Sequence, residues 1–260
     1  MLIPFIKMHA QGNDFVILDA FFFPLPELDY PTLARRICRL HTGIGADGLV
    51  IISPCTEADA RMVIYNADGS RAEMCGSALR CISELMHKKL QTDKLTVLTD
   101  SGVKSVNISS QDALIAVNLG VPHMLRKNYP ALGFVGDLID VGNLHYVVWK
   151  DELADNPHLL YGSALELYSG FPRPVNAHFA KVISPHEIEI KIWEHACGAT
   201  LACGTGAASC VFSGVNNGIL LSPVKVNMPG GSVEIILDQA AYVLSGEVTI
   251  AFSGEYHWKA

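Results

Sequence analysis

The chain has 260 residues, of which 50% are hydrophobic and 17% are charged, and its formal net charge at pH 7 is −7. This length suits one large domain or two ordinary ones, and the abundance of apolar residues excludes a disordered chain. The negative charge, without any cluster of lysines and arginines, argues against a nucleic-acid-binding protein.

The first residues lack the basic start, long apolar run and small-residue cleavage site of a secretory signal. No apolar stretch is long enough to span a bilayer, so we expect no membrane partner. Seven cysteines form no regular framework. An odd number of this kind fits free thiols in a reducing compartment better than a disulfide scaffold, and we expect a cytoplasmic protein.

Apolar runs predict strands at 15–18, 49–52 and 61–65, and an early proline favours a helix over 31–40. The string 43–48 matches the G-x-G-x-x-G pattern of dinucleotide sites. It follows a helix and precedes a strand, however, which is the reverse of the order that such a site requires. We therefore expect no nucleotide cofactor at this loop.

A helical pattern occurs twice, each time directly after a Cys-Gly pair. Apolar residues recur at helical spacing in 77–90, which places Cys75 and Gly76 at a helix N-terminus. The segment 205–215 behaves in the same way after Cys203 and Gly204. Alternating patterns predict further strands at 94–99, 103–108, 113–119, 188–193, 233–237 and 247–252.

The two halves of the chain share nearly one sequence offset. Cys75 and Cys203 are 128 positions apart, and the Gly-Asn asparagines Asn13 and Asn143 are 130 positions apart. This fits duplication of a single α/β unit made of several strands and a central helix. We expect one domain over 1–118, completed by 252–260, and a second over 119–251.

The position of the two cysteines suggests their chemistry. Unpaired backbone N–H groups and the positive end of the helix dipole favour a thiolate at a helix N-terminus, whereas an ordinary thiol is only about 3% ionised at pH 7. The glycine that follows lets a substrate carboxylate approach the backbone. One thiolate could remove an α-hydrogen while the other thiol delivers a proton to the opposite face of the carbon.

Other uses of the thiols fit less well. Neither motif has C-x-x-C spacing, which disfavours a redox pair or a zinc ribbon, and we expect no metal site. A Cys-His hydrolase needs only one nucleophilic cysteine, so the second Cys-Gly pair would have no catalytic role. A non-catalytic binding protein for a small acid stays open, although binding does not require two thiols. The remaining cysteines are expected to be small buried hydrophobes: Cys38, Cys55, Cys81, Cys197 and Cys210.

Motifs over almost the whole chain resemble the diaminopimelate epimerase family. The matching segments are Lys7-Met8-His9, Gly12-Asn13-Asp14-Phe15, His41 with 43–49, 66–70, 73–76, Gly142-Asn143 with His145, Trp193-Glu194, 200–206 and 229–231. The resemblance implies an isomerase without a cofactor, commonly a homodimer. It also implies an α/β fold of the α+β type, with two similar pseudo-twofold-related domains around one active site. Each domain would be a mixed, mostly antiparallel sheet wrapped around a central helix.

The resemblance also assigns roles by position. Cys75 and Cys203 would be the acid and the base, exchanging roles with reaction direction. Backbone amides at Gly76, Ser77, Gly204 and Thr205 would hold the reacting carboxylate. The positions that match substrate contacts of the family are Asn13, Asn66, Asn143, Asn176 and Glu194.

The chain departs from the family pattern at positions that bear on the substrate. The family's Cys-Gly-Asn is here Cys75-Gly76-Ser77, its Gly-Asn-Pro-His has Leu144 in place of proline, and its Glu-Gly stretch before Asn176 is here Arg-Pro-Val. Its Glu-Arg pair is here Glu194-His195.

The family's arginine would grip the distal carboxylate of diaminopimelate with a planar charged fork, and His195 offers less charge and a shorter reach. His195 is therefore a candidate specificity residue. Conversion of LL- to meso-diaminopimelate and racemisation of another amino acid, such as histidine, both stay open.

Overall fold

This computed structural model describes residues 1–21, 23–25, 28–109, 114–239 and 241–258. The chain forms two compact units, Met1–Val117 with Glu247–Ala260 (unit 1) and Asn118–Gly246 (unit 2). The returning segment of unit 1 begins earlier than the expected residue 252, because its strand pairs with the N-terminal strand from Thr249 onward. No helix among the described residues is long and apolar enough to cross a membrane.

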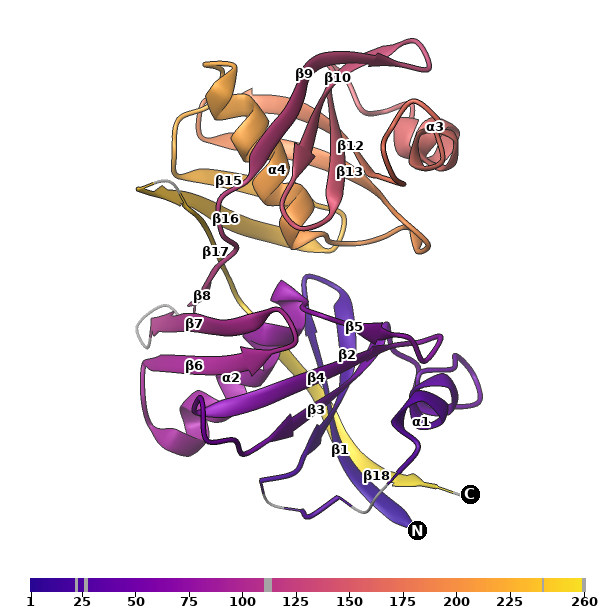
Figure 1. Cartoon of the computed structure of the whole chain (residues 1–260), viewed down its shortest axis with the longest axis vertical. Helices are drawn as coiled ribbons and strands as arrows, with labels where there is room; N and C mark the ends of the chain where they lie inside the picture. Colours follow the sequence, from indigo (N-terminus) through magenta and orange to yellow (C-terminus); the bar gives the residue numbers. More distant parts are fainter. Residues whose placement is uncertain (22, 26–27, 110–113, 240, 259–260) are drawn as a thin grey trace. The chain divides into compact units, whose positions relative to one another are not determined.

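Unit 1 consists of a mixed sheet and two helices, α1 and α2, which lie between strands in the order of the chain (Figure 1). Its elements are β1 (Leu2–Ala10), β2 (Asn13–Asp19), α1 (Tyr30–Ile37), β3 (Gly48–Ser53), β4 (Ala60–Asn66), β5 (Arg71–Ala72), α2 (Gly76–Leu90), β6 (Lys94–Thr99), β7 (Gly102–Ser109), β8 (Leu114–Asn118, ending at the unit boundary) and β18 (Thr249–His257). The strand order is β18-β1-β2-β3-β4-β6-β7-β8, and only the pairs β2–β3 and β4–β6 within it are parallel.

Unit 2 has a sheet of the same design. Its elements are β9 (His123–Ala131), β10 (Phe134–Asp140), β11 (Leu144–Trp149), α3 (Pro157–Glu166), β12 (Asn176–Ser184), β13 (Glu187–Glu194), β14 (Gly198–Ala199), α4 (Gly204–Asn216), β15 (Val224–Met228), β16 (Gly231–Asp238) and β17 (Ala241–Gly246). The strand order is β9-β10-β11-β12-β13-β15-β16-β17, and here the pairs β11–β12 and β13–β15 are parallel.

The two strand orders match position by position, including the places of the parallel pairs. Helices α2 and α4 follow corresponding strands, and each contacts strands from both halves of its own sheet. Each sheet therefore wraps around a central helix, as Figure 1 shows for both units. The predicted α+β fold of two similar units, with mixed and mostly antiparallel sheets, is confirmed.

Each helix and strand expected from the sequence has a counterpart in the structure, with shifted ends. Helix α1 stops at Ile37 rather than at residue 40, and its start is fixed by Asp29, whose side chain accepts a hydrogen bond from Thr32 N at 3.1 Å. The G-x-G-x-x-G string lies between α1 and β3, in the helix-then-strand order that the sequence indicates. Residue 113 of the expected strand 113–119 lies outside the described residues.

Alternation along the central strands of unit 2 separates a core face from a second face. Tyr146 and Ala177, which are in register, belong with Phe179 to a buried apolar cluster. Helix α3 contacts β12 and β13, and its Leu165 belongs to the same cluster. Because successive side chains of a strand point to opposite faces, His145 and His178 point away from this cluster. Helix α4 contacts both of their strands, β11 and β12.

The packing of α3 on β13 leaves no room beside Gly162. A Cβ built there would lie 2.5 Å from Cγ of Trp193. We expect Gly162→Ala to lower the free energy of unfolding by about 1–3 kcal/mol, because overpacking outweighs the roughly 1 kcal/mol gained in helix propensity. Urea denaturation measures the change. Ser163→Ala, at the exposed neighbouring position, is the matched control, and equal stability of the two variants would contradict this account of the packing.

Candidate active site

Cys75 caps the central helix of unit 1. Its backbone is extended (φ −143°, ψ 121°), and α2 begins at the next residue, Gly76. Asn13 Nδ2, from the first residue of β2, donates to Cys75 Sγ at 3.9 Å. The structure thus brings together two of the residues that the sequence nominates for the site.

The first turn of α2 is a potential anion site. The N–H groups at the start of a helix have no partner within the helix, and they lie at its positive end. Gly76 and the buried Ser77 occupy this turn. Asn66 is exposed at the end of β4, where its side chain donates to Ser70 Oγ at 2.9 Å within its own turn. These positions stay predictions as substrate contacts.

A buried cation accompanies Cys75, and the sequence patterns do not single it out. Arg80 is 1% exposed, and its Nη1 donates to Glu247 O at 3.3 Å. Its Nε has no hydrogen-bond partner in the described part of the chain. Burial lowers the pKa of Arg80 to about 10, and the Cys81 and Cys75 thiols oppose this shift. The positive charge of Arg80 therefore favours a thiolate nearby.

Cys203 caps the central helix of unit 2 with almost the same backbone (φ −139°, ψ 108°). Its Sγ accepts a hydrogen bond from Gly206 N at 3.4 Å and lies 3.6 Å from Thr205 Oγ1. The residue is buried and only 4% exposed. Gly204 and Thr205 form the first turn of α4.

A buried carboxylate accompanies this second thiol. Glu194, the last residue of β13, accepts from Thr200 Oγ1 at 2.6 Å and forms a hydrogen bond with Cys203. Burial raises the pKa of Cys203 well above its usual value, and the charge and hydrogen bond of Glu194 raise it further. Burial also raises the pKa of Glu194. The Cys203 side chain is therefore a protonated thiol at neutral pH.

Two buried histidines adjoin Cys203. His145 Nδ1 lies 2.8 Å from His178 Nε2, and His145 Nε2 lies 2.9 Å from Asn143 Oδ1. One nitrogen of each ring and Cys203 Sγ all lie within 4.8 Å of one another. Burial lowers the pKa of His178 to about 3 and that of His145 well below its usual value, so both rings are neutral at pH 7.

Sequence reasoning placed His145 in a family motif without a role and missed His178 entirely. His178 lies on a buried strand, two residues after Asn176. An inward histidine on a strand is most often a core residue. The only available signal was that His178 and Asn176 share one face of β12.

Asn176 and His195 are held within unit 2. Asn176 is buried; its Nδ2 donates to Leu144 O at 2.9 Å and its Oδ1 accepts from His195 N at 3.0 Å. His195 Nδ1 lies 2.8 Å from Glu166 Oε1, on α3. Glu166 also accepts from Trp193 Nε1 at 2.7 Å and from Ala196 N at 3.0 Å. Glu166, which the sequence did not indicate, thus orients the segment around His195.

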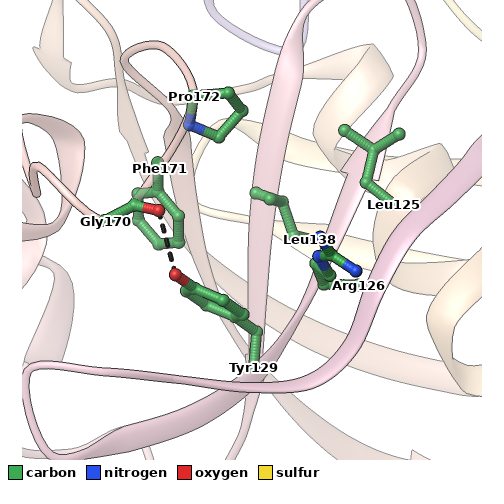
Figure 2. Close-up of a pocket in the computed structure, with 7 residues that line it drawn as sticks. All are labelled: Leu125, Arg126, Tyr129, Leu138, Gly170, Phe171 and Pro172. Atoms are coloured by element: carbon green, nitrogen blue, oxygen red, sulfur yellow. Dashed lines mark hydrogen bonds between the residues drawn. The ribbon is translucent and has the colours of Figure 1, made fainter.

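Unit 2 also has a pocket of about 560 Å³ that contains none of the nominated residues. Figure 2 shows it beside Tyr129, whose hydroxyl donates to Gly170 O at 2.9 Å. Its lining is Leu125, Arg126, Tyr129, Leu138, Gly170, Phe171 and Pro172. We do not assign the two-cysteine chemistry to this pocket, because neither cysteine lines it.

Comparison with known proteins relates the whole chain to one family. The family model for diaminopimelate epimerase matches residues 5–125 and 138–251. The diaminopimelate epimerase of Pelotomaculum thermopropionicum is 35% identical over 98% of this chain and 99% of its own length. That of Carboxydothermus hydrogenoformans is 37% identical over 97% of this chain and 98% of its own length.

Solved structures share the fold at low sequence identity. A phenazine biosynthesis protein of the PhzF family from Bacillus anthracis superposes with a TM-score of 0.76 at 14% identity, covering 99% of this chain and all of that one. A hydroxyproline epimerase from Agrobacterium vitis, with bound trans-4-hydroxy-L-proline, has a TM-score of 0.70 at 12% identity, covering 98% and 92% of the two chains.

The repeated unit, its central helices capped by cysteine, and these relatives define an isomerase that acts as an amino-acid epimerase. The chain belongs to the diaminopimelate epimerase family, which confirms the resemblance seen in its motifs.

Replacing Glu166 by glutamine should destabilise the fold in a pH-dependent way. Burial acts to raise the pKa of Glu166, but hydrogen bonds from Ala196, Trp193 and His195 lower it below its usual value. A lowered carboxyl pKa stabilises the folded state above the pKa of the unfolded chain, and this stabilisation is lost as the pH falls. We expect a loss of about 1–3 kcal/mol near pH 7 that diminishes below about pH 4. Urea denaturation across pH checks this, and a pH-independent difference would contradict it.

The two capping thiols should differ in alkylation rate. We expect iodoacetamide to modify Cys203 in a Cys75→Ser variant more slowly at pH 8 than it modifies Cys75 in a Cys203→Ser variant. The reason is that burial and Glu194 raise the pKa of Cys203, and only the thiolate reacts. Mass spectrometry of the peptides separates these sites from Cys197, which is exposed rather than buried as the sequence analysis expects. Faster modification of Cys203 would contradict the described environment.

Proposed function

We propose that this epimerase inverts the α-carbon of a free amino acid by proton transfer between Cys75 and Cys203, without a cofactor, and that LL-diaminopimelate is converted to the meso form. The family and the names of its relatives support the substrate. The observation that carries the mechanism is that a cysteine caps the central helix of each unit.

The surroundings of the thiols support a division of labour. Cys75 adjoins the amide of Asn13 and the buried charge of Arg80, both of which favour a thiolate. Cys203 adjoins Glu194 and stays protonated. In one direction, Cys75 takes the α-proton and Cys203 donates its thiol proton to the opposite face of the same carbon. The roles reverse in the other direction, as in any two-base mechanism.

The N-termini of the two central helices would stabilise the α-carboxylate of the substrate. In this proposal the backbone N–H groups of Gly76, Ser77, Gly204 and Thr205 hold the α-carboxylate, where negative charge builds up as the proton leaves. Fixed dipoles of this kind need no rearrangement during the reaction. Asn13, Asn66, Asn143, Asn176 and Glu194 are the proposed contacts to the rest of the substrate.

A second candidate substrate rests on His195. Its Nδ1 faces Glu166, so a negative charge lies close to the position where the family has an arginine. A carboxylate there disfavours the distal carboxylate of diaminopimelate and suits a polar or basic group. Racemisation of an amino acid such as histidine is therefore the alternative function.

We also propose that the chain acts as a homodimer in the cytoplasm. The family resemblance supports the dimer, and large apolar side chains are exposed on and beside α3: Leu159, Leu160 and Leu167. No disulfide joins the seven cysteines, which suits a reducing compartment. Sedimentation velocity of the purified protein tests the dimer, and a monomer at all concentrations would overturn it.

Hydrogen exchange in D2O tests the function and the substrate together. Purified protein is incubated with LL-diaminopimelate, histidine and a panel of other amino acids, and incorporation of deuterium at the α-carbon is followed by NMR. We expect exchange and epimerisation of diaminopimelate. A matched sample of the Cys75→Ala/Cys203→Ala double variant should show neither process.

The outcomes separate the hypotheses. Exchange with histidine but not with diaminopimelate would reassign the substrate while keeping the two-thiol mechanism. Exchange with no amino acid would reject the epimerase reaction and leave a small-acid binding protein. Full activity of the double variant would reject the role of the cysteines.

A further inference from the structure

The buried cluster beside α4 contains more metal-binding groups than an epimerase requires. His145 and His178 each bring a ring nitrogen, and Cys203 brings its sulfur, within 4.8 Å of one another. Glu194 adds a carboxylate that is hydrogen-bonded with the same thiol. Imidazole, thiolate and carboxylate are the ligands that bind Zn²⁺ in proteins. All four residues belong to unit 2, so the cluster does not depend on the placement of unit 1.

Their positions follow from the sheet. In the parallel register of β11 and β12, His178 lies beside Val147, two residues after His145, so both histidines are on one face. In the antiparallel register of β12 and β13, His178 lies beside Ile192, two residues before Glu194. The side chains of His145, His178 and Glu194 therefore lie on the face of the sheet opposite to the buried apolar cluster that contains Leu165 of α3. Cys203 joins them from the N-terminus of α4.

The hydrogen-bond pattern leaves one ring nitrogen without a partner. The oxygen of the Asn143 amide can only accept, so His145 Nε2 carries a proton and His145 Nδ1 is bare. His178 Nε2 must then donate to His145 Nδ1, which leaves His178 Nδ1 bare as well. This atom is buried and has no hydrogen-bond partner in the part of the chain that the structure describes. A bare imidazole nitrogen is the form that binds a metal.

Distances and charge both fit a tetrahedral ion. Zn–N bonds of about 2.1 Å and Zn–S bonds of about 2.3 Å place ligand atoms roughly 3.3–3.6 Å apart. One nitrogen of each ring and Sγ lie at most 4.8 Å apart, so binding draws the ligand atoms closer together to reach this spacing. One divalent cation, one thiolate and one carboxylate sum to zero charge, which lowers the cost of burying the ion.

We propose that His145, His178, Cys203 and Glu194 form a binding site for Zn²⁺, and that occupation of this site inhibits the enzyme reversibly. On binding, Sγ loses its proton to solvent and forms a bond to the ion. The hydrogen bond between the two rings is exchanged for metal–nitrogen bonds, and neither ring loses a proton. The inhibition, though not the binding, rests on the proposed role of Cys203, because a metal-bound thiolate cannot donate a proton.

No local sequence pattern indicates this site, because its ligands come from separate elements, β11, β12, β13 and the start of α4. They lack the short Cys and His spacings by which zinc sites are recognised. Only the folded sheet brings them together.

Binding is tested first on the wild-type protein, without reliance on any variant. The protein is loaded with one equivalent of Zn²⁺ after removal of trace metal, and the ligand set is measured by X-ray absorption at the zinc edge. We expect one sulfur and three nitrogen or oxygen ligands. Two sulfurs, or only nitrogen and oxygen ligands, would overturn the assignment.

Affinity and inhibition are then compared in variants by calorimetry and by exchange activity. His178→Asn should weaken Zn²⁺ binding by more than the roughly 10–100-fold that loss of an outer partner of a metal ligand costs. His158→Asn removes another buried histidine of unit 2, on α3 and outside the cluster, and should bind Zn²⁺ like the wild type. Cys75→Ser should also keep its affinity. Unchanged affinity in His178→Asn, or loss of affinity in Cys75→Ser, would overturn the site.

The experiments distinguish failure of the zinc site from failure of the proposed epimerase function. Tight binding with the expected ligands but no loss of exchange activity would keep the site and overturn its inhibitory role. An inactive protein that binds Zn²⁺ as described would reject the epimerase proposal while leaving the metal site intact. Reversal of inhibition by a chelator is expected, and irreversible loss of activity would contradict it.

Discussion

The structure of each unit depends on one feature: the N-terminus of its central helix is capped by a cysteine in extended conformation. Cys75 and Cys203 have nearly the same backbone angles, and each is followed by the glycine that begins a central helix. The first N–H groups of a helix have no partner within the helix and can bind a ligand, whereas the rest of a central helix is covered. The sheet that wraps each helix supplies that cover, and duplication of the unit supplies the arrangement twice.

The two copies are alike in backbone and different in charge. The positive charge of Arg80 interacts with the first thiol, whereas Glu194 hydrogen-bonds with the second. The proposed mechanism needs a thiolate and a thiol before each turnover, and two identical environments would not favour such a pair. The described neighbours favour the thiolate at Cys75 and the thiol at Cys203. In the proposed mechanism, the repeated unit provides the two capping cysteines, and the different buried charged residues beside them provide the difference in proton affinity.

The repeat, the central helices and the capping cysteines could be predicted from the sequence, because they rest on local signals such as apolar spacing and the Cys-Gly pairs. The strand order could not, since pairing such as β4 with β6 joins segments separated by a whole helix. The sequence analysis expects the chain to return to unit 1 at residue 252, and the earlier return at Glu247 depends on the long-range pairing of β18 with β1.

Side-chain partners were the least predictable part of the site. Nothing in the spacing of Glu166 and His195 shows that they meet, and their contact changes the charge expected at the proposed specificity position. His178 and Arg80 resemble ordinary members of a buried strand and of an amphipathic helix, and only their burial without full hydrogen bonding marks them. Long-range contacts of this kind depend on the register between strands rather than on any local pattern.

The central claim is that each thiol serves one face of the α-carbon. It is tested most directly by following α-hydrogen exchange in D2O with Cys75→Ser and Cys203→Ser separately, each incubated with the separated stereoisomers of the active substrate. The account predicts that each variant exchanges one stereoisomer only, that the two variants prefer opposite stereoisomers, and that interconversion falls by about 10²–10⁴-fold in both. A single variant that exchanged both stereoisomers, or interconverted them at the wild-type rate, would contradict it.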